Sequence, residues 1–328
     1  MDESDQLGLW SQQSEQAVPA GSSPLSPLIR FGTSTWAYEG WQGLVYKQSY
    51  EPSRFRSECL AEYARYEYEG YRLFRTVGFD FTFYGPATAR QLTHYSSQVP
   101  KDFVACSKVW EELTVPAYSR HPRHGSHTGP NPYFLNTDYF QEQVLAPYAA
   151  AFKPHTGPFI FEFQRTLDLE AEDFLKRLDG FLAHLPKEWE YAIEVRHERL
   201  LTREYRAILS THGVAHVYNH WTHMPGLIEQ HRLMDEIFTA PFAVLRLLTP
   251  RGVRYEDAVR RYKPYRDIVQ SLPEMRENTV RLVEQAVSEH RRAYVLVNNR
   301  SEGSAPCTIQ AIFNIMKRGQ AARVTAQS

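Results

Sequence analysis

The stretch PFIFEFQ, residues 158–164, is a short apolar run that closes on Glu162 and Gln164. Strands of a parallel sheet are covered on both faces, and they therefore read as nearly continuous apolar runs. Because side chains alternate along a strand, Glu162 and Gln164 share one face and the three phenylalanines share the other. We expect the phenylalanines to pack under helices and the polar pair to point into a closed barrel.

Five other apolar runs carry polar or charged residues near their C-terminal ends: FVACSK ends at Lys108, YAIEVR at Glu194 and Arg196, VAHVYN at Asn219, FAVLRLL contains Arg246, and AYVLVNN ends at Asn298 and Asn299. From Ile29 onward such runs alternate with amphipathic segments, and a strand followed by a helix recurs eight times. This order predicts an α/β fold, a single (β/α)8 TIM-type barrel with long loops at its C-terminal mouth. The polar strand ends would surround that mouth, where such barrels carry their active sites.

Composition limits the class of protein. The chain has 328 residues, of which 42% are hydrophobic, and this is enough for the core of one large domain. Its 37 basic residues are balanced by 38 acidic ones, so no global charge excess indicates nucleic acid or an anionic membrane. Any affinity for anions is therefore local.

Cysteine usage and the N-terminus indicate where the protein works. The three cysteines form no CxxC pair, which argues against a disulfide framework and against a cysteine-based zinc site. No apolar run approaches the roughly 18 residues of a membrane span, and the N-terminus does not read as a signal peptide. We expect a cytoplasmic protein without a membrane partner.

The domain organisation follows from periodicity. Residues 1–27 are rich in Ser, Gln and Pro, which predicts a flexible tail before a barrel domain over residues 28–320. Residues 115–137 hold Pro, Gly and His at a density that excludes a regular element, and they fit a loop over the mouth and a surface insertion equally well. Residues 249–267 follow the seventh strand and fit either a solvated helix face or a receiver of phosphates.

Three cations and two carboxylates are predicted to point into the barrel near its mouth. Burying Lys108, Arg196 and Arg246 with Glu162 and Glu194 is costly unless partners or a ligand compensate them. In the functional interpretation the cations hold an anion while Glu194, or else Glu162, exchanges a proton as the catalytic acid or base. The competing interpretation is an ion-pair network that only stabilises the barrel, and position at several strand ends favours function.

Further residues near the strand ends are candidates for binding the ligand. Asn298 and Asn299 would hydrogen-bond it, and the other predicted contacts are Trp36, Tyr38, Gln164 and His197. Ser34 and Thr35 in GTSTW can donate hydrogen bonds, although this loop alone is a weak phosphate signal.

The residues also raise two other chemistries, glycoside hydrolysis and metal binding. A pair of glutamates raises glycoside hydrolysis, but three neighbouring cations lower the pKa values and weaken the acid half of that mechanism. His197, His216, His220 and His223 lie near strand ends without a diagnostic ligand spacing, so we predict no metal site. No cofactor fingerprint is present, and the sequence identifies no cofactor.

Five blocks in order resemble the DUF72 family, the YecE-like proteins: GTSTWAYEGWQGLVY from Gly32, FDFTFYGPAT, FVACSKVWEELT, IEVRH, and VNNRSEGSAP from Val297. The resemblance covers residues 31–312 and implies a TIM barrel of undefined activity. It also implies a glutamate where this chain has Gly78, and histidines where it has Val115 and Arg300. If relatives use those positions for catalysis, this chain has altered or lost it, and Asp80 replaces the glutamate only if the strand shifts its register.

These observations lead to one leading hypothesis and two alternatives. The leading hypothesis is a hydrolase that acts on a phosphate- or carboxylate-bearing substrate by general acid/base chemistry at the barrel mouth. The first alternative is a non-catalytic protein that binds a small anionic ligand. The second is a nucleic-acid-processing enzyme, in which Trp36, Tyr38, Trp41, Tyr84 and Trp110 stack bases, and the balanced net charge counts against it.

Overall fold

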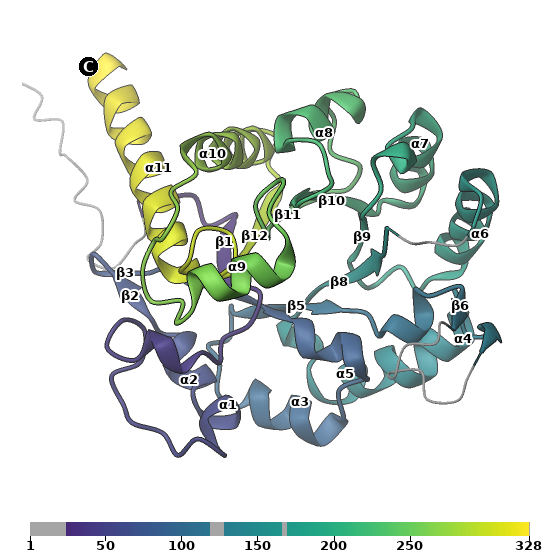
Figure 1. The fold of residues 1–328 in the computed structure, drawn as a ribbon, viewed down its shortest axis with the longest axis horizontal. Helices are drawn as coiled ribbons and strands as arrows, with labels where there is room; N and C mark the ends of the chain where they lie inside the picture. Colours follow the sequence, from purple (N-terminus) through teal and green to yellow (C-terminus); the bar gives the residue numbers. More distant parts are fainter. Residues whose placement is uncertain (1–23, 119–127, 166–168, 328) are drawn as a thin grey trace, which may run out of the picture.

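The computed structural model describes residues 24–118, 128–165 and 169–327. Eight strands form one parallel sheet: β1 (Ile29–Thr33), β4 (Thr76–Phe79), β5 (Val104–Lys108), β8 (Thr156–Phe163), β9 (Tyr191–Val195), β10 (Ala215–His220), β11 (Phe242–Leu247) and β12 (Arg292–Val297). Their order is β1-β12-β11-β10-β9-β8-β5-β4, and a parallel bridge between Phe31 and Phe74 joins the two edges. The sheet is thus a nearly closed barrel, and the predicted TIM-type fold is confirmed (Figure 1).

Helices surround the sheet, and Figure 1 shows α6, α7, α8, α10 and α11 arranged around its outside. The described helices are α1 (Phe55–Glu58), α2 (Leu60–Tyr63), α3 (Ala89–Ser96), α4 (Thr137–Phe140), α5 (Ala146–Ala151), α6 (Ala171–His184), α7 (Arg203–His212), α8 (Leu227–Leu233), α9 (Tyr255–Tyr262), α10 (Pro273–Ser288) and α11 (Ala305–Gln327). None of the helices in these ranges combines the length and the apolar character that a membrane crossing requires. Most of the predicted tail, residues 1–23, lies outside the described residues.

Alternation along β8 separates two cores, as the sequence predicts. Phe161 packs outward against Phe140 of α4 and Phe181 of α6, with ring centroids 5.1 and 5.3 Å apart. Ile160, on the opposite face, belongs to a second buried cluster inside the barrel. The apolar interior ends at Glu162, and the polar mouth begins there.

Two glycines allow β1 and β4 to approach closely at the seam of the barrel. A Cβ atom at Gly32 would lie 2.1 Å from the Thr76 carbonyl oxygen, which is far inside van der Waals contact. A Cβ at Gly78 would lie 3.0 Å from the Ser34 carbonyl oxygen. The seam therefore depends on backbone packing that side chains would obstruct.

The two segments that interrupt the repeat contain short regular elements. Residues 117–118 (β6) pair antiparallel with residues 129–130 (β7), so the prediction that residues 115–137 exclude a regular element is wrong at these flanks. The reason is local pairing of the two ends of the loop. Its His-rich centre, residues 119–127, lies outside the described residues. The second segment forms α9, as the helical interpretation of residues 249–267 allows.

Candidate functional site

A cavity of about 610 Å³ opens at the C-terminal ends of the strands. Its volume is typical of sites for small molecules. Seven of the predicted site residues line it: Tyr38, Lys108, Glu162, Gln164, Arg196, Arg246 and Asn298. Three of them, Lys108, Glu162 and Arg246, lie within strands, and side-chain alternation brings these three together at the mouth.

Glu162 lies at the centre of the cavity floor, on β8. Its Oε2 accepts from Lys108 Nζ at 3.0 Å, Arg196 Nη2 at 2.7 Å and Arg246 Nη1 at 3.1 Å. Gln164 Nε2 donates to the other oxygen at 2.6 Å. Burial alone would raise the pKa of Glu162, but the three adjacent cations outweigh burial and hold this pKa well below its usual value. Glu162 is therefore a carboxylate at neutral pH and has no proton to donate.

Arg246 joins Glu162 to two further carboxylates. Its Nη1 donates to Glu194 Oε2, and its Nη2 donates to Asp80 Oδ1 and Oδ2 at 3.0 and 2.9 Å. Burial opposes the charge of Arg246, yet Asp80, Glu194 and Glu162 together raise its pKa above the usual value. The guanidinium is thus charged, and both of its terminal nitrogens donate to carboxylates.

Asp80 reaches this network from a position that the sequence interpretation made conditional. It follows β4 directly in the 3-10 turn η2 (Asp80–Tyr84), while β4 pairs with β5 in continuous register from Thr76 to Phe79. Asp80 therefore reaches Arg246 without a shifted register, because the turn alone carries its carboxylate there, and its replacement of a relative's glutamate stays a prediction.

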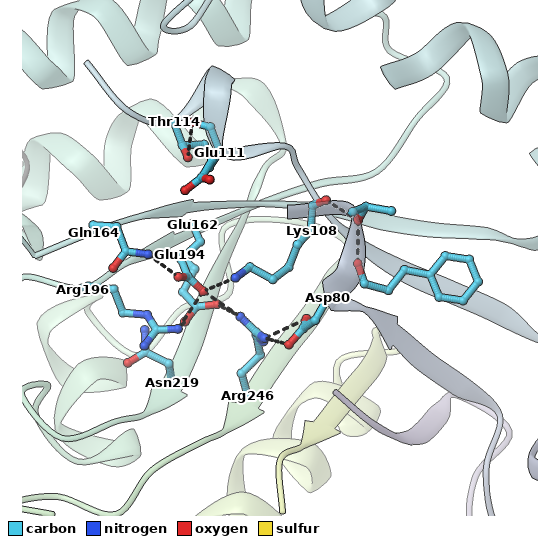
Figure 2. Close-up of polar contacts among 12 residues, drawn as sticks. Asp80, Lys108, Glu111, Thr114, Glu162, Gln164, Glu194, Arg196, Asn219 and Arg246 are labelled. Atoms are coloured by element: carbon cyan, nitrogen blue, oxygen red, sulfur yellow. Dashed lines mark hydrogen bonds and ion pairs between the residues drawn. The ribbon is translucent and has the colours of Figure 1, made fainter. Parts of the chain in front are cut away.

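The floor of the cavity is balanced in charge, as Figure 2 shows. We use the name floor network for three cations and three carboxylates that contact one another: Lys108, Arg196, Arg246, Asp80, Glu162 and Glu194. The competing prediction of an ion-pair network thus describes how these side chains are arranged. Each of the three predicted anion-holding cations is already engaged by a carboxylate.

The rim of the cavity carries positive charge that no described carboxylate neutralises. Arg56 and Arg300 line the cavity, and neither forms an ion pair within the described part of the chain. Arg300 lies over the ring of Tyr255, with Cζ 4.5 Å from the ring centroid. Aromatic rings also cover floor cations, since Lys108 Nζ is 3.8 Å from the centroid of Phe83 and Arg196 Cζ is 4.6 Å from that of Trp221.

Four predicted site residues do not line the cavity. Glu194 is fully buried behind the floor. Trp36 is 1% exposed and packs against the rings of Phe79 and Tyr95 in the core. Its indole N–H donates to the Arg56 carbonyl at 2.9 Å. His197 Nδ1 accepts from the Arg199 amide, and Asn299 Oδ1 accepts from the Ala305 amide at the start of α11. His197 and Asn299 thus hold turns that follow strands, a role that position at a strand end does not distinguish from ligand binding.

The cavity also includes residues that were not predicted as its contacts: Arg56, Asp80, Phe81, Phe83, Trp221, Leu248, Thr249 and Arg300. Most of them lie in turns just after strands, where the period-2 pattern that marks strand faces no longer applies. Arg56 comes from α1, and no sequence pattern links it to the mouth. Tyr255 lies in the basic segment that was considered as a receiver of phosphates.

Burial lowers the pKa values of two of the four histidines near the strand ends, His216 and His220. His216 Nδ1 lies 3.2 Å from the Tyr205 hydroxyl, and burial lowers the pKa of His216 to about 3. Burial likewise lowers the pKa of His220 to about 4. Across the described ranges, no three His, Cys, Asp or Glu side chains are grouped so that they could hold a metal ion.

Comparisons with known proteins identify relatives by fold and by sequence. A solved DUF72 family protein of Enterococcus faecalis V583 has a TM-score of 0.59 and 18% identity, over 87% of this chain and 95% of that chain. A DUF72 family protein of Thermotoga maritima MSB8 has a TM-score of 0.58 and 19% identity, over 88% of this chain and 99% of that chain.

The sequence comparisons assign the family. No curated protein matches the chain. The sequence model of the family described as "Protein of unknown function DUF72" matches residues 30–328, and this range contains the floor network and both rim arginines. The chain therefore belongs to the DUF72 family, as its five sequence blocks predict.

Proposed function

We propose that the barrel mouth binds a small anionic ligand that carries a phosphate or a carboxylate. One observation carries this proposal, the excess of positive charge on the cavity lining. Five lining residues are cations and two are carboxylates: Arg56, Lys108, Arg196, Arg246 and Arg300 against Asp80 and Glu162. A concave site whose lining carries an excess of one sign of charge attracts ligands of the opposite sign.

The contacts of the two glutamates favour binding over the predicted acid/base hydrolysis. Glu162 is held ionised, so it does not supply a general acid at neutral pH. Glu194 is fully buried and lies beside Glu162 in the register of β8 and β9. Arg196 contacts both carboxylates, so the pair lies on one side of the cavity and does not flank a scissile bond.

Hydrolysis remains the second candidate because of Asp80. Its side chain is 29% exposed and lines the cavity, whereas the Glu162 side chain is 6% exposed. A carboxylate in this position can orient a water molecule against a bound ligand. Turnover of a bound phosphate ester that is lost in Asp80→Asn would raise this candidate above simple binding.

Native mass spectrometry of the full-length protein tests the binding proposal. We expect a co-purified or added anion, with inorganic phosphate as the first probe, to remain bound to the wild-type protein. The double variant Arg56→Gln/Arg300→Gln should lose it, because it removes the unpaired charges and leaves the floor network intact. The matched control is Arg177→Gln/Arg318→Gln, which removes two exposed arginines on α6 and α11. Equal retention by both double variants would refute the proposal.

Two further predictions concern the binding partner of the protein and its location in the cell. Of the aromatic residues expected to stack bases, Trp36 and Trp41 are buried to 1% and 0% exposure, whereas Tyr38 and Tyr84 line the cavity, and the nucleic-acid alternative stays a prediction. The free cysteines Cys59, Cys106 and Cys307 are consistent with the predicted cytoplasmic location, which stays a prediction. Fractionation of the cells that make the protein would test it.

A further inference from the structure

One wall of the cavity rim, at the ends of β1 and β12, carries several hydrogen-bond donors. Strands β1 and β12 pair in parallel, with Thr33 opposite Val297, and the Ser34 amide donates to the Val297 carbonyl at 2.9 Å. The next residues on the two strands, Ser34 and Asn298, therefore lie side by side at the mouth. Arg300 follows two residues later and lines the same cavity.

Side-chain donors on this wall lack protein acceptors. The Ser34 hydroxyl is buried, at 2% residue exposure, and has no hydrogen-bond partner in the described structure. Asn298 uses its Oδ1 to accept from the Arg300 amide at 3.0 Å, so its Nδ2 donors are left for the cavity. A buried donor without an acceptor is costly, and a ligand oxygen would remove that cost.

Arg300 is held in place without being neutralised. Its guanidinium lies against the Tyr255 ring, and the Tyr265 hydroxyl is a further neighbour. Burial raises the pKa of both Tyr38 and Tyr265, so these phenols near Arg300 are uncharged at neutral pH. The floor carboxylates are occupied by Arg246, Arg196 and Lys108. Arg300 therefore adds to the cavity lining, just after β12, a positive charge that no described carboxylate pairs.

We infer that the ends of β1 and β12 form a phosphate-monoester subsite, in which Arg300, Ser34 and Asn298 bind the phosphoryl oxygens. The inference rests on the proposed function and narrows its ligand to phosphate esters. Donors from three residues suit a group with three terminal oxygens better than a carboxylate, which one guanidinium saturates. Phosphates in (β/α)8 barrels are commonly held by the loops after the seventh and eighth strands, and β12 is the eighth.

The rest of the cavity has room for the esterified part of the ligand. A phosphate fills a small part of the 610 Å³, and Phe81, Phe83 and Trp221 supply an apolar wall beyond the rim. Tyr255 is 57% exposed and stands beside Arg300. A ring attached to the phosphate would contact these aromatic side chains.

Titration of the full-length protein with phenyl phosphate and with benzoate tests the subsite. We expect phenyl phosphate to bind at least about tenfold more tightly than benzoate, and Arg300→Gln to weaken it by about tenfold or more. Ser34→Ala should weaken it a few-fold while the melting temperature stays the same or rises, since the free protein loses an unpaired buried hydroxyl. Arg177→Gln, which removes an exposed arginine of α6, is the control and should bind as wild type.

The outcomes separate this inference from the proposed function. Binding that survives Arg300→Gln but is lost in Lys108→Gln would move the anion to the floor and overturn the subsite, while anion binding at the mouth would stand. Benzoate that binds as tightly as phenyl phosphate would overturn the ester class. Binding of neither compound to the wild-type protein would overturn both proposals.

Discussion

The floor and the rim of the cavity use the same residue type in opposite ways. On the floor, Arg246 is buried and donates to three carboxylates. On the rim, Arg300 contacts aromatic rings and forms no ion pair with a described carboxylate. An arginine that is paired with carboxylates supports the structure around it, whereas one without a carboxylate partner is available to a ligand. Whether a cation is already paired is therefore more informative about binding than whether it faces the mouth.

The largest effect should follow from breaking the floor. Arg246→Ala leaves Asp80, Glu162 and Glu194 without their shared cation, and we expect it to lower the free energy of unfolding by about 3–5 kcal/mol. Urea denaturation measures this change. Arg260→Ala is the control, because its exposed pair with Asp257 should contribute less than about 1 kcal/mol. A similar small cost for both variants would show that the floor is not the scaffold described above.

A smaller effect on the free energy of unfolding should appear at acidic pH, where Glu162 on the floor becomes protonated. The pKa of Glu162 is lower in the folded protein than its usual value of 4.5, so its contribution is present above about pH 4.5 and is lost as the pH falls through the folded pKa. The stability difference between wild type and Glu162→Gln should therefore shrink below about pH 4.5. Urea denaturation at about pH 7 and about pH 3.5 measures it. A difference that does not change with pH would contradict the low pKa.

The smallest expected effect is on ligand affinity. Asp80→Asn should strengthen the binding of inorganic phosphate, whereas the rim variant Arg56→Gln/Arg300→Gln should weaken it. Asp80→Asn removes a floor carboxylate that lines the cavity, so the lining becomes more positive. We expect inorganic phosphate to bind a few-fold more tightly, which corresponds to about 1 kcal/mol. Calorimetric titration checks this, with Asp173→Asn in the exposed first turn of α6 as the matched control. Weaker binding by Asp80→Asn would mean that Asp80 contacts the ligand directly.

The barrel could be predicted from the sequence because its strands are regular. Period-2 alternation assigned Phe161 to the outer core and Glu162 to the mouth, and the count of eight apolar runs gave the architecture. The same rule brought Lys108 and Arg246 together although 138 positions separate them (246 − 108). These results depend only on which face of a strand a residue occupies.

Pairing within the site could not be predicted in the same way. Alternation shows that Arg196 and Glu194 face inward. It does not show that Arg196 is already paired with two carboxylates or that Glu194 is closed off from the cavity. Turns after strands have no fixed period, so Asp80 and Arg300 were not assigned their contacts. Trp36 and His197 were assigned to the ligand because capping, core packing and binding all occur at strand ends.

The narrow seam at Gly78 has a consequence for how relatives of this chain are compared. A Cβ atom at position 78 would lie 3.0 Å from the Ser34 carbonyl oxygen, so a glutamate there would require the Ser34 backbone to shift. The negative charge is instead supplied two residues later by Asp80, from a turn that has left the strand. If relatives carry a glutamate at position 78, as the resemblance implies, Asp80 would place a carboxylate at the same mouth from a different column of a sequence alignment.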